Sequence, residues 1–474
     1  MKKNSLVKKL ALLMSAIMIL TSLAVVASAT EEPATYDVWD GLSYDMTPFE
    51  GIIPNASYDA SVNSPIIIDS AAKLAGLSKF VNDAKVKGSA GALPGWPIYI
   101  TKNIDLAGHP FKSIGCDYSI AMFSGLLEGR LNGEEGKAPI IMNLNIIDSS
   151  TNNIGFVGTL RGGAMKNLTF ENAKVGHPDT KFGVAIAVGY PCKNVEISGI
   201  TVKNSTVIGG SSLNVSGIGA IIGVMKADNE ITLKDLYAEN VNFVCEDYHI
   251  NPVGGIIGIV QSKQPVHFEN CYYSGKIIQL DSWGIIETDL PMGGIVGTTS
   301  NEGLAPTITM KNCHYDGQLA YAGEDRIAAV GAFVGRMVSG GSLVLEDCQY
   351  TGANADALVG ATDALEGASE GLTISITNTV SVADIPLLKG SAEGHTITGE
   401  VTYNISEPEP TDPQPSAPAD PEPSKPADPQ PSEPQGGDQE PAPAGGIQAW
   451  VVIVVGIVCL AAGAGIGIVI KKKQ

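Results

Sequence analysis

The sequence predicts an all-β fold, a right-handed parallel β-helix in which each sequence repeat forms one turn. The main observation is a glycine motif, hydrophobic-Gly-x-hydrophobic-hydrophobic-Gly in its usual form, which occurs six times at intervals of 31 to 39 residues. A period of this size is typical of a unit stacked on copies of itself, each burying a face of its neighbour. The copies are Ile154–Gly158, Val184–Gly189, Ile218–Gly223, Val253–Gly258, Met292–Gly297 and Val330–Gly335.

A second, weaker consensus follows each glycine motif and supports the same fold. It consists of a turn residue, four residues that alternate apolar and polar, and a final Asn or Gly. Alternation at period two predicts a strand with one buried face. Asn or Gly at the end suits the left-handed backbone of a sharp bend. The copies are Asn167–Asn172, Gly199–Asn204, Asp235–Asn240, Asn270–Gly275, Asn312–Gly317 and Asp347–Gly352.

The alignment of these strands predicts two columns of like residues inside the core. The first inward column ends in Cys271, Cys313 and Cys348, and the second ends in Tyr273, Tyr315 and Tyr350. Adjacent turns lie about 4.8 Å apart. A disulfide between neighbouring cysteines and a ladder of buried thiols, which behave as small apolar groups, are therefore both compatible with the sequence.

The repeat has no helical period, and about 35 residues is enough for three short strands and three turns. The apolar glycine segments are expected to be buried on both faces, as strands of parallel sheets are. A β-propeller is the alternative, but its blades need four antiparallel strands. Few Asn-Gly or Asp-Gly hairpin turns occur at suitable places.

Both ends of the solenoid are expected to differ from its middle, because terminal units must seal the core. Residues 30–153 are predicted to form an N-terminal cap and the first turns. They include an amphipathic helix after the N-cap pair Asp69-Ser70. Residues 154–405 are predicted to form the repeats and a C-terminal cap. The predicted strands outside the repeats are Ile98–Leu106, Phe111–Gly115, Leu372–Ile376 and His395–Tyr403.

The two ends of the chain predict export and anchoring. Residues 1–29 combine four lysines, an apolar run and Ala27-Ser-Ala29, which is typical of a cleaved signal peptide. Residues 406–446 hold 13 of the 28 prolines and predict an extended stalk. Residues 447–470 carry no charge and predict a transmembrane helix, followed by a basic cytoplasmic tail, 471–474. We therefore expect a single-pass protein of the cell surface with its N-terminal part outside.

Charge and composition exclude some classes of function. The net charge is −20, and seven of the 30 basic residues lie in the signal peptide and the tail, so the exported part carries about −27. Such a surface repels nucleic acid. The six histidines are scattered, and the cysteines form no close C-x-x-C pair, so no metal site and no cofactor are predicted. Calcium at acidic turns such as Asp235 and Asp347 stays an open alternative.

The candidate binding residues are Tyr237, Tyr272 and His314. They occupy the same outward position of successive strands, so they are expected to stack as a half-exposed aromatic stripe. Such a stripe could lie against sugar rings or against an apolar patch of a partner. The alternative is a structural ladder between strands, covered by a loop.

The glycine motifs and their lead-in resemble the GLUG-motif repeat family of exported bacterial proteins. The resemblance covers about residues 64 to 352 and is carried by Gly255-Ile-Ile-Gly258, Gly294-Ile-Val-Gly297, Asn270-Cys-Tyr272 and the lead-in Ala72–Leu77. It implies a β-helix on a Gram-positive cell surface, in adhesin-like proteins, and it brings no catalytic residues. The C-terminal end is similar to a sortase sorting signal. However, Pro441–Gly446 replaces the Leu-Pro-x-Thr-Gly motif, so retention in the membrane is preferred to covalent attachment to the wall.

The function expected from these observations is non-enzymatic binding of a host or matrix glycan or protein. The alternative is a carbohydrate-active enzyme, a polysaccharide lyase or glycoside hydrolase, on the same scaffold. Paired catalytic acids must face one sugar bond, and no two adjacent strands offer an acid at the fourth position of the consensus strand. No catalytic residue is therefore predicted.

Overall fold

The computed structural model describes residues 34–403 apart from 86–90, 118–120, 148–151, 178–181, 210–216, 246–250, 263, 280–290, 300–305, 322–328, 339, 364–370 and 390–393. Contacts divide the chain into the units Met1–Glu409 and Pro410–Gln474, and all described residues belong to the first. The predicted signal peptide, stalk, transmembrane helix and basic tail lie outside the described residues. Within the described ranges, no helix has the length and apolar character needed to cross a bilayer.

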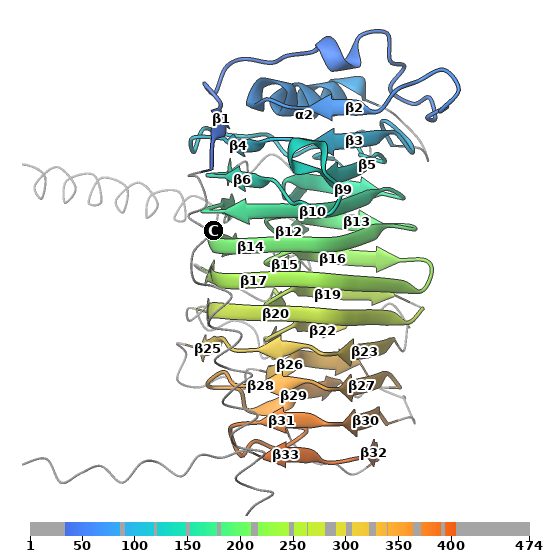
Figure 1. Ribbon diagram of the computed structural model, residues 1–474. Helices are drawn as coiled ribbons and strands as arrows, with labels where there is room; N and C mark the ends of the chain where they lie inside the picture. The colour runs from blue at the N-terminus through green and yellow to red at the C-terminus, as the bar shows by residue number, and fades with distance from the viewer. Residues whose placement is uncertain are drawn as a thin grey trace, which may run out of the picture. The chain divides into compact units, whose positions relative to one another are not determined.

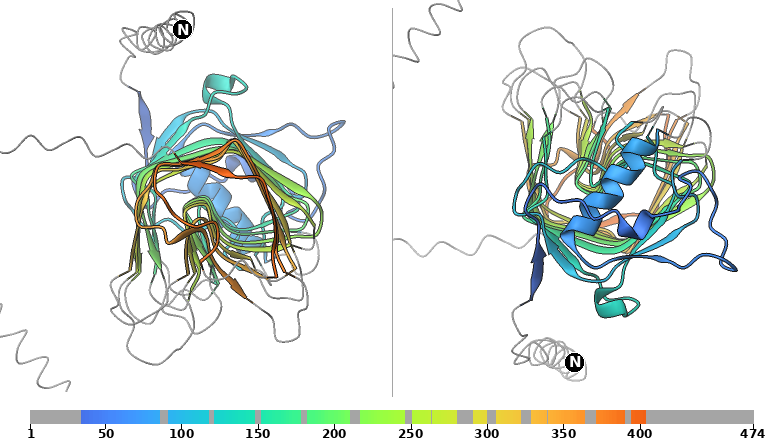
Figure 2. Two further views of the ribbon diagram at one scale, coloured as in Figure 1. Left: turned by 90° about the horizontal axis from the view of Figure 1, so that it is seen from below. Right: turned by 90° about the horizontal axis from the view of Figure 1, so that it is seen from above.

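The described part of the first unit is a parallel β-solenoid, as the repeats predict (Figure 1). All pairings between its named strands are parallel, and each strand pairs with the equivalent strand of the next turn. A 21-stranded and a 12-stranded sheet run along the stack. Seen along the axis, the larger sheet curves around the smaller one (Figure 2), so we call them the outer and the inner sheet.

The outer sheet contains β1 (Tyr36–Val38), β2 (Ile66–Ile68), β3 (Pro97–Ile100), β4 (Asn103–Asp105), β5 (Leu126–Gly129), β6 (Ile140–Met142), β7 (Asn145–Ile146), β10 (Ala164–Glu171), β11 (Lys174–Gly176), β14 (Glu196–Gly209), β17 (Ile231–Cys245), β20 (Val266–Gln279), β23 (Thr307–Lys311), β24 (His314–Tyr315), β25 (Gln318–Tyr321), β27 (Ser342–Glu346), β28 (Gln349–Tyr350), β30 (Thr373–Thr377), β31 (Thr379–Ser381), β32 (Thr396–Thr398) and β33 (Val401–Tyr403). The inner sheet contains β8 (Asn153–Ile154), β9 (Val157–Arg161), β12 (Gly183–Val184), β13 (Val188–Cys192), β15 (Gly217–Gly219), β16 (Ile222–Ala227), β18 (Val253–Gly254), β19 (Ile257–Ser262), β21 (Pro291–Gly293), β22 (Val296–Thr299), β26 (Ala329–Val338) and β29 (Ala357–Asp363).

The glycine motifs form the inner sheet, where they are buried on both faces. Their glycines are needed because the backbone itself fills the space a side chain would take. A Cβ at Gly254 would collide with the Ile257 carbonyl, and a Cβ at Gly258 would collide with the Ile218 amide of the preceding turn. The motif is therefore a packing device in which strands approach more closely than side chains allow.

The outer sheet follows the predicted alternation, and both predicted core columns are confirmed. The first inward column consists of Leu168, Ile200, Leu236, Cys271, Cys313 and Cys348, all at most 1% exposed. The second consists of Phe170, Val202, Ala238, Tyr273, Tyr315 and Tyr350, also at most 1% exposed. The three cysteines are free thiols in the structure. Of the two alternatives for these residues, the structure has the buried ladder.

Two bends divide each turn of the outer sheet. At the first bend, which we call the entry corner, every residue of the consensus has a positive φ between 52° and 64°: Asn167, Gly199, Asp235, Asn270, Asn312 and Asp347. Amide side chains link this corner between turns, since Asn270 Nδ2 donates to Asp235 Oδ1 and Asn312 Nδ2 donates to Asn270 Oδ1, both at 2.8 Å. A residue that tolerates the left-handed region thus also ties adjacent turns together.

The second bend, which we call the exit corner, is left-handed in only part of the stack. Asn172, Asn204 and Asn240 have φ values of 55°, 48° and 52°, as expected. The expectation is wrong for Gly317 and Gly352, which are not among the described residues with positive φ. Instead, a Cβ at Gly317 would lie 2.7 Å from the rings of Tyr273 and Tyr315. Glycine stands there because bulky core rings press against the backbone.

The predicted helix is present as α2 (Ala71–Ala84), at the N-terminal end of the described solenoid (Figure 1). The Ser70 hydroxyl accepts the Lys73 amide at 3.3 Å, which satisfies one free N–H of the first turn. Leu74, Leu77 and Val81 are fully buried. Two short 3-10 helices, η1 (Thr47–Phe49) and η2 (Leu131–Gly133), complete the described helices.

One predicted strand near this end is wrong. The segment Phe111–Gly115 makes no strand, and within it only Ile114 forms an isolated bridge, to Val157 of the inner sheet. Gly115 has a φ of 71°, which breaks the extended backbone. The other strands predicted outside the repeats are present, although Ile98–Leu106 divides into β3 and β4, and His395–Tyr403 divides into β32 and β33.

Candidate binding site

One column of outward residues crosses six neighbouring strands of the outer sheet. Strand pairing sets the order of the column, which is Thr169, Thr201, Tyr237, Tyr272, His314 and Gln349. The three residues singled out from the sequence are therefore consecutive on the solenoid surface. Tyr237 is 39% exposed, and Tyr272 and His314 are partly buried.

Of these three residues, Tyr272 and His314 form a direct ring contact. Their ring centroids lie 5.3 Å apart, with the planes inclined by 60°. Tyr237 joins them through the pairing of β17 with β20. Burial raises the pKa of Tyr237, and the nearby charge of Asp235 adds to this effect. The phenol is therefore neutral at physiological pH and offers a hydroxyl beside an apolar ring.

A short polar chain extends from His314. Its Nε2 lies 2.6 Å from the Thr351 hydroxyl, which in turn donates to Asp316 Oδ1 at 2.8 Å. Because the threonine proton points to the carboxylate, His314 Nε2 must carry the proton that it donates to Thr351. Burial lowers the pKa of His314, and the charge of Asp316 partly opposes this shift. The arrangement orients the imidazole and ties the stripe to Asp316.

Asp316 and Thr351 lead directly into a surface pocket of about 490 Å³. The pocket lies along the exit corner and spans the strands from β17 to the segment after β28. Asp316 and Thr351 precede the corner glycines, and Lys276 and Gln318 follow them. The residues that line it are Asn240, Asn242, Gly275, Lys276, Asp316, Gly317, Gln318, Thr351, Gly352 and Ala353.

The pocket forms where the exit corner loses one residue. The pairing of β17 with β20 passes from Ala238↔Tyr273 to Val241↔Gly275, so β17 has one more residue at this bend than β20. The preceding pair of strands, β14 and β17, keeps its register through the same bend. From β20 onward the corner is shorter and carries glycine instead of asparagine. The asparagine side chains of the earlier corners are missing there, and Gly275, Gly317 and Gly352 line the pocket instead.

Stacked tyrosines lie beneath the floor of this pocket. The rings of Tyr273 and Tyr315 are 5.9 Å apart and those of Tyr315 and Tyr350 are 5.5 Å apart, both nearly parallel. The Tyr273 hydroxyl donates to the Val241 carbonyl at 2.9 Å. The Tyr315 hydroxyl is buried and finds no hydrogen-bond partner within the described part of the chain. One polar group under the glycine floor is therefore unsatisfied, which is costly in a protein interior.

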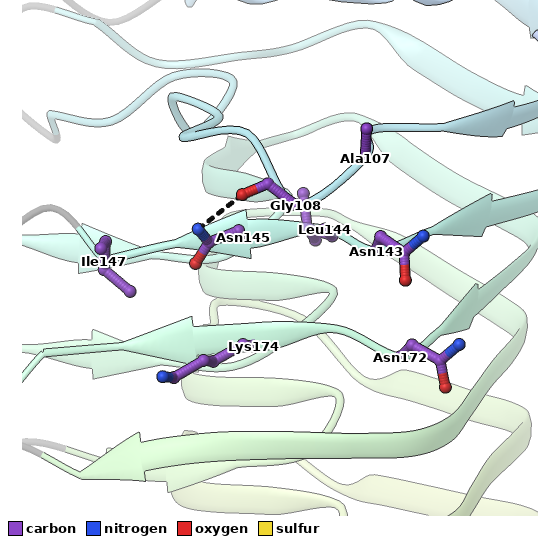
Figure 3. Close-up of a pocket in the computed structure, with 8 residues that line it drawn as sticks. All are labelled: Ala107, Gly108, Asn143, Leu144, Asn145, Ile147, Asn172 and Lys174. Carbon is purple, nitrogen blue, oxygen red and sulfur yellow. Dashed lines mark hydrogen bonds between the residues drawn. The ribbon is translucent and has the colours of Figure 1, made fainter. Parts of the chain in front are cut away.

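A second pocket, of about 520 Å³, lies on the same corner nearer the N-terminus (Figure 3). It is lined by Ala107, Gly108, Asn143, Leu144, Asn145, Ile147, Asn172 and Lys174. The amides of Asn143 and Asn172 lie one above the other on adjacent turns (Figure 3). Asn145 Nδ2 donates to the Gly108 carbonyl at 2.8 Å, whereas its buried Oδ1 has no partner among the described groups.

Metal binding gains no support from the described acids. Asp235 accepts a hydrogen bond from Asn270, and Asp347 accepts one from Asn378. These carboxylates therefore link adjacent turns at the entry corner. Within the described ranges, no three His, Cys, Asp or Glu residues cluster as a metal site would need. The chemistry available at the exit corner is that of hydrogen bonding and of contact with aromatic rings.

Comparison with known proteins finds likeness only among solved structures. No protein-family model matches the chain, and no curated protein matches it. A crystal structure described as a "putative immunoglobulin A1 protease from Bacteroides ovatus" aligns with 73% of this chain and 85% of its own, at 17% identity and a TM-score of 0.41. A structure named IgA1 Protease aligns with 72% of this chain and 23% of its own, at 12% identity and a TM-score of 0.35.

The pocket residues beyond the stripe are the part of the site that the sequence did not reveal. Asn242, Lys276 and Gln318 form one outward column by strand pairing, but they lie past the end of the aligned consensus. One feature of the sequence could have pointed to the pocket, namely the change from Asn to Gly at the last position of the consensus. Its meaning depends on the tyrosines packed behind it, so only the structure reveals the pocket.

Proposed function

We propose that this chain is a cell-surface protein that binds a glycan or protein of a host or matrix through the outer sheet of its right-handed β-solenoid. The observation that carries the proposal is the outward stripe of Tyr237, Tyr272 and His314, which strand pairing aligns. The ring centroids of Tyr272 and His314 lie 5.3 Å apart. Extended solenoid faces suit such binding. Aromatic side chains supply contact area at a low entropy cost.

The proposal includes the placement of the solenoid. The signal peptide would export it, α2 and the last turns would cap its core, and the Pro-rich stalk would hold it away from the membrane helix. The resemblance to GLUG-motif proteins supports a Gram-positive surface. Mass spectrometry of the mature C-terminus tests the anchor. An intact 447–474 segment supports membrane retention, and a chain that ends near Pro441–Gly446 and carries a peptidoglycan fragment supports sortase attachment.

The binding function is tested with the full chain purified in detergent, applied to an array of glycans and immobilised matrix proteins. Retention without turnover is expected, and replacement of Tyr237, Tyr272 and His314 by alanine should abolish it. A triple substitution of Thr169, Thr201 and Gln349, the other members of the column, is the matched control and should leave retention unchanged. Depolymerisation of a polysaccharide by the chain would overturn the proposal in favour of an enzyme.

A further inference from the structure

The exit-corner pocket, which is lined by residues from Asn240 to Ala353 on successive turns, contains side chains whose hydrogen-bonding groups are free to meet a ligand. Within the described part of the chain, the Gln318 amide and the Lys276 ammonium make no hydrogen bond or ion pair. Asp316 uses one carboxylate oxygen for Thr351. Asn242 accepts the Lys276 backbone amide through Oδ1, which leaves its Nδ2 donor for a ligand. Planar amides and a carboxylate, set around a hollow of about 490 Å³, form a site rich in directional donors and acceptors.

The aromatic pair of Tyr272 and His314 lies beside this pocket. His314 is two residues before Asp316 on the same outward face, and it contacts both Tyr272 and Thr351. A ligand in the pocket could thus place an apolar face on the rings and hydroxyl groups on the amides. This combination matches a sugar, since a pyranose ring has C–H faces and a rim of hydroxyls.

The direction of the site also fits a chain of sugars. The pocket runs across several turns, which are stacked about 4.8 Å apart, a spacing close to the length of one pyranose unit. Successive units would therefore meet equivalent positions, such as Lys276 and Gln318 or Asp316 and Thr351. An extended peptide is less suited, because peptides recognised by sheets pair with a free strand edge, and the strands here are paired on both sides.

Charge selects among sugars. The pocket holds one lysine and one aspartate, which leaves it without net charge. The whole chain carries −20 at neutral pH, so it repels polyanions such as sulfated or uronate-rich glycans. We propose that the exit-corner pocket binds a neutral oligosaccharide that lies along the solenoid axis, with Tyr272 and His314 as its stacking platform. This inference rests on the proposed binding function and names its ligand class.

The test uses the full chain in detergent and a panel of neutral oligosaccharides (cello-, chito-, manno- and galacto-oligomers), with hyaluronan, heparin and collagen as probes of the other classes. Binding of a neutral oligomer is expected. Asp316→Asn and Gln318→Ala should each weaken it about 3- to 10-fold, since the first exchanges a carboxylate acceptor for an amide donor and the second removes an amide. Ala353→Trp, which fills the pocket from an exposed position, should weaken it more than tenfold. Thr206→Val, on the same outward column but outside the pocket, is the control and should change nothing.

The outcomes separate this inference from the proposed function. Binding that needs Tyr272 but is insensitive to Ala353→Trp and Asp316→Asn would leave the stripe in place and overturn the pocket. Retention of collagen or a polyanion in place of neutral oligomers would also overturn it, while surface binding would stand. Absence of binding to every probe would count against both. Circular dichroism of each variant checks that the solenoid is intact.

Discussion

Single residues in the tyrosine ladder differ in how well their polar groups are satisfied. The Tyr273 hydroxyl donates to the Val241 carbonyl, whereas the buried Tyr315 hydroxyl has no partner within the described residues. Removal of a made hydrogen bond in the interior costs about 1 kcal/mol, and removal of an unmade one relieves desolvation. The same chemical change is therefore expected to act in opposite directions one turn apart.

The first prediction is that Tyr273→Phe lowers the free energy of unfolding by about 1 kcal/mol, while Tyr315→Phe leaves it unchanged or raises it. Urea unfolding of the full chain, followed by circular dichroism, measures both. The two variants are matched controls for each other, because each removes one oxygen from a stacked, fully buried ring. Equal losses in both would show that a ligand or water satisfies the Tyr315 hydroxyl.

The second prediction concerns His314, whose pKa is lowered by burial. Because the unfolded chain then binds the proton more readily than the folded chain, acidification favours unfolding. The stability contribution is complete above the ordinary histidine pKa of about 6.5 and declines as pH falls toward the lowered folded value. The charge of Asp316 moderates the effect. The other groups that adjoin His314 are Tyr272, Gln349 and Thr351.

Thermal unfolding of the chain and of His314→Gln, measured between pH 7.5 and 5, tests this prediction. The melting temperature of the native chain should fall more steeply with acidification than that of the variant. His267, which pairs with exposed Glu230 at 3.0 Å, gives a control variant, His267→Gln, that keeps His314. A steeper fall in the His314 variant than in the native chain would contradict the assigned sign.

At the scale of the structural element, the entry corner combines two requirements in one side chain. Asn270 has a φ of 55°, and its amide both donates to Asp235 and accepts from Asn312. Asparagine meets both requirements, whereas glycine meets only the first. The recurrence of Asn and Asp at this position follows from this double role, because it links backbone geometry to the contact between turns.

The third prediction separates these two contributions. Asn270→Ala should cost about 1–2 kcal/mol from the left-handed backbone alone, in addition to the lost amide bonds. Asn270→Gly loses the same bonds but accepts the φ, so its denaturation midpoint should fall less. Chemical denaturation of the two variants gives the difference, and identical midpoints would mean that the amide bonds alone matter.

At the exit corner, the tyrosines of the core determine which residues fit in the bend. Tyr273, Tyr315 and Tyr350 fill the core behind it. A Cβ at Gly317 or Gly352 would meet tyrosine rings, and a Cβ at Gly275 would meet the Val241 backbone. Overpacking a filled core costs about 1–3 kcal/mol, so side chains are excluded from this stretch of the corner. The large rings inside thus explain why Gly317 and Gly352 stand in the lining of the pocket.

On the scale of the whole molecule, the core is continuous along the stack, and Cys271, Cys313 and Cys348 are free thiols buried within it. Burial raises the pKa of the Cys192 and Cys313 thiols. The hydrogen bond that the Cys348 thiol donates to Cys313, followed by burial, raises the pKa of Cys348. Few thiolates form, and reagents reach them only when the turns separate. These thiols therefore report on the opening of the solenoid.

The fourth prediction is that Cys271, Cys313 and Cys348 resist alkylation in the native full chain and are all modified in denaturant without reductant. Peptide-level mass spectrometry after iodoacetamide treatment measures the modification of each residue. Denatured chain that has been treated with reductant serves as the reference for complete modification. If two of the three become reactive only after reduction, a disulfide joins them and the free-thiol ladder is wrong.

The sequence by itself determined the solenoid, because its period and its strand alternation are local patterns that each turn repeats. Those patterns also placed the inward column that begins at Leu168 and ends at Cys348 in the core. They aligned Tyr237, Tyr272 and His314 on the surface. Local patterns do not reveal how one turn pairs with the next when their lengths differ. The register shift between Ala238 and Val241 and the packing of Gly317 and Gly352 against tyrosine rings are such non-local effects. Tertiary structure alone decided them, since each depends on side chains about 35 residues apart competing for the same space.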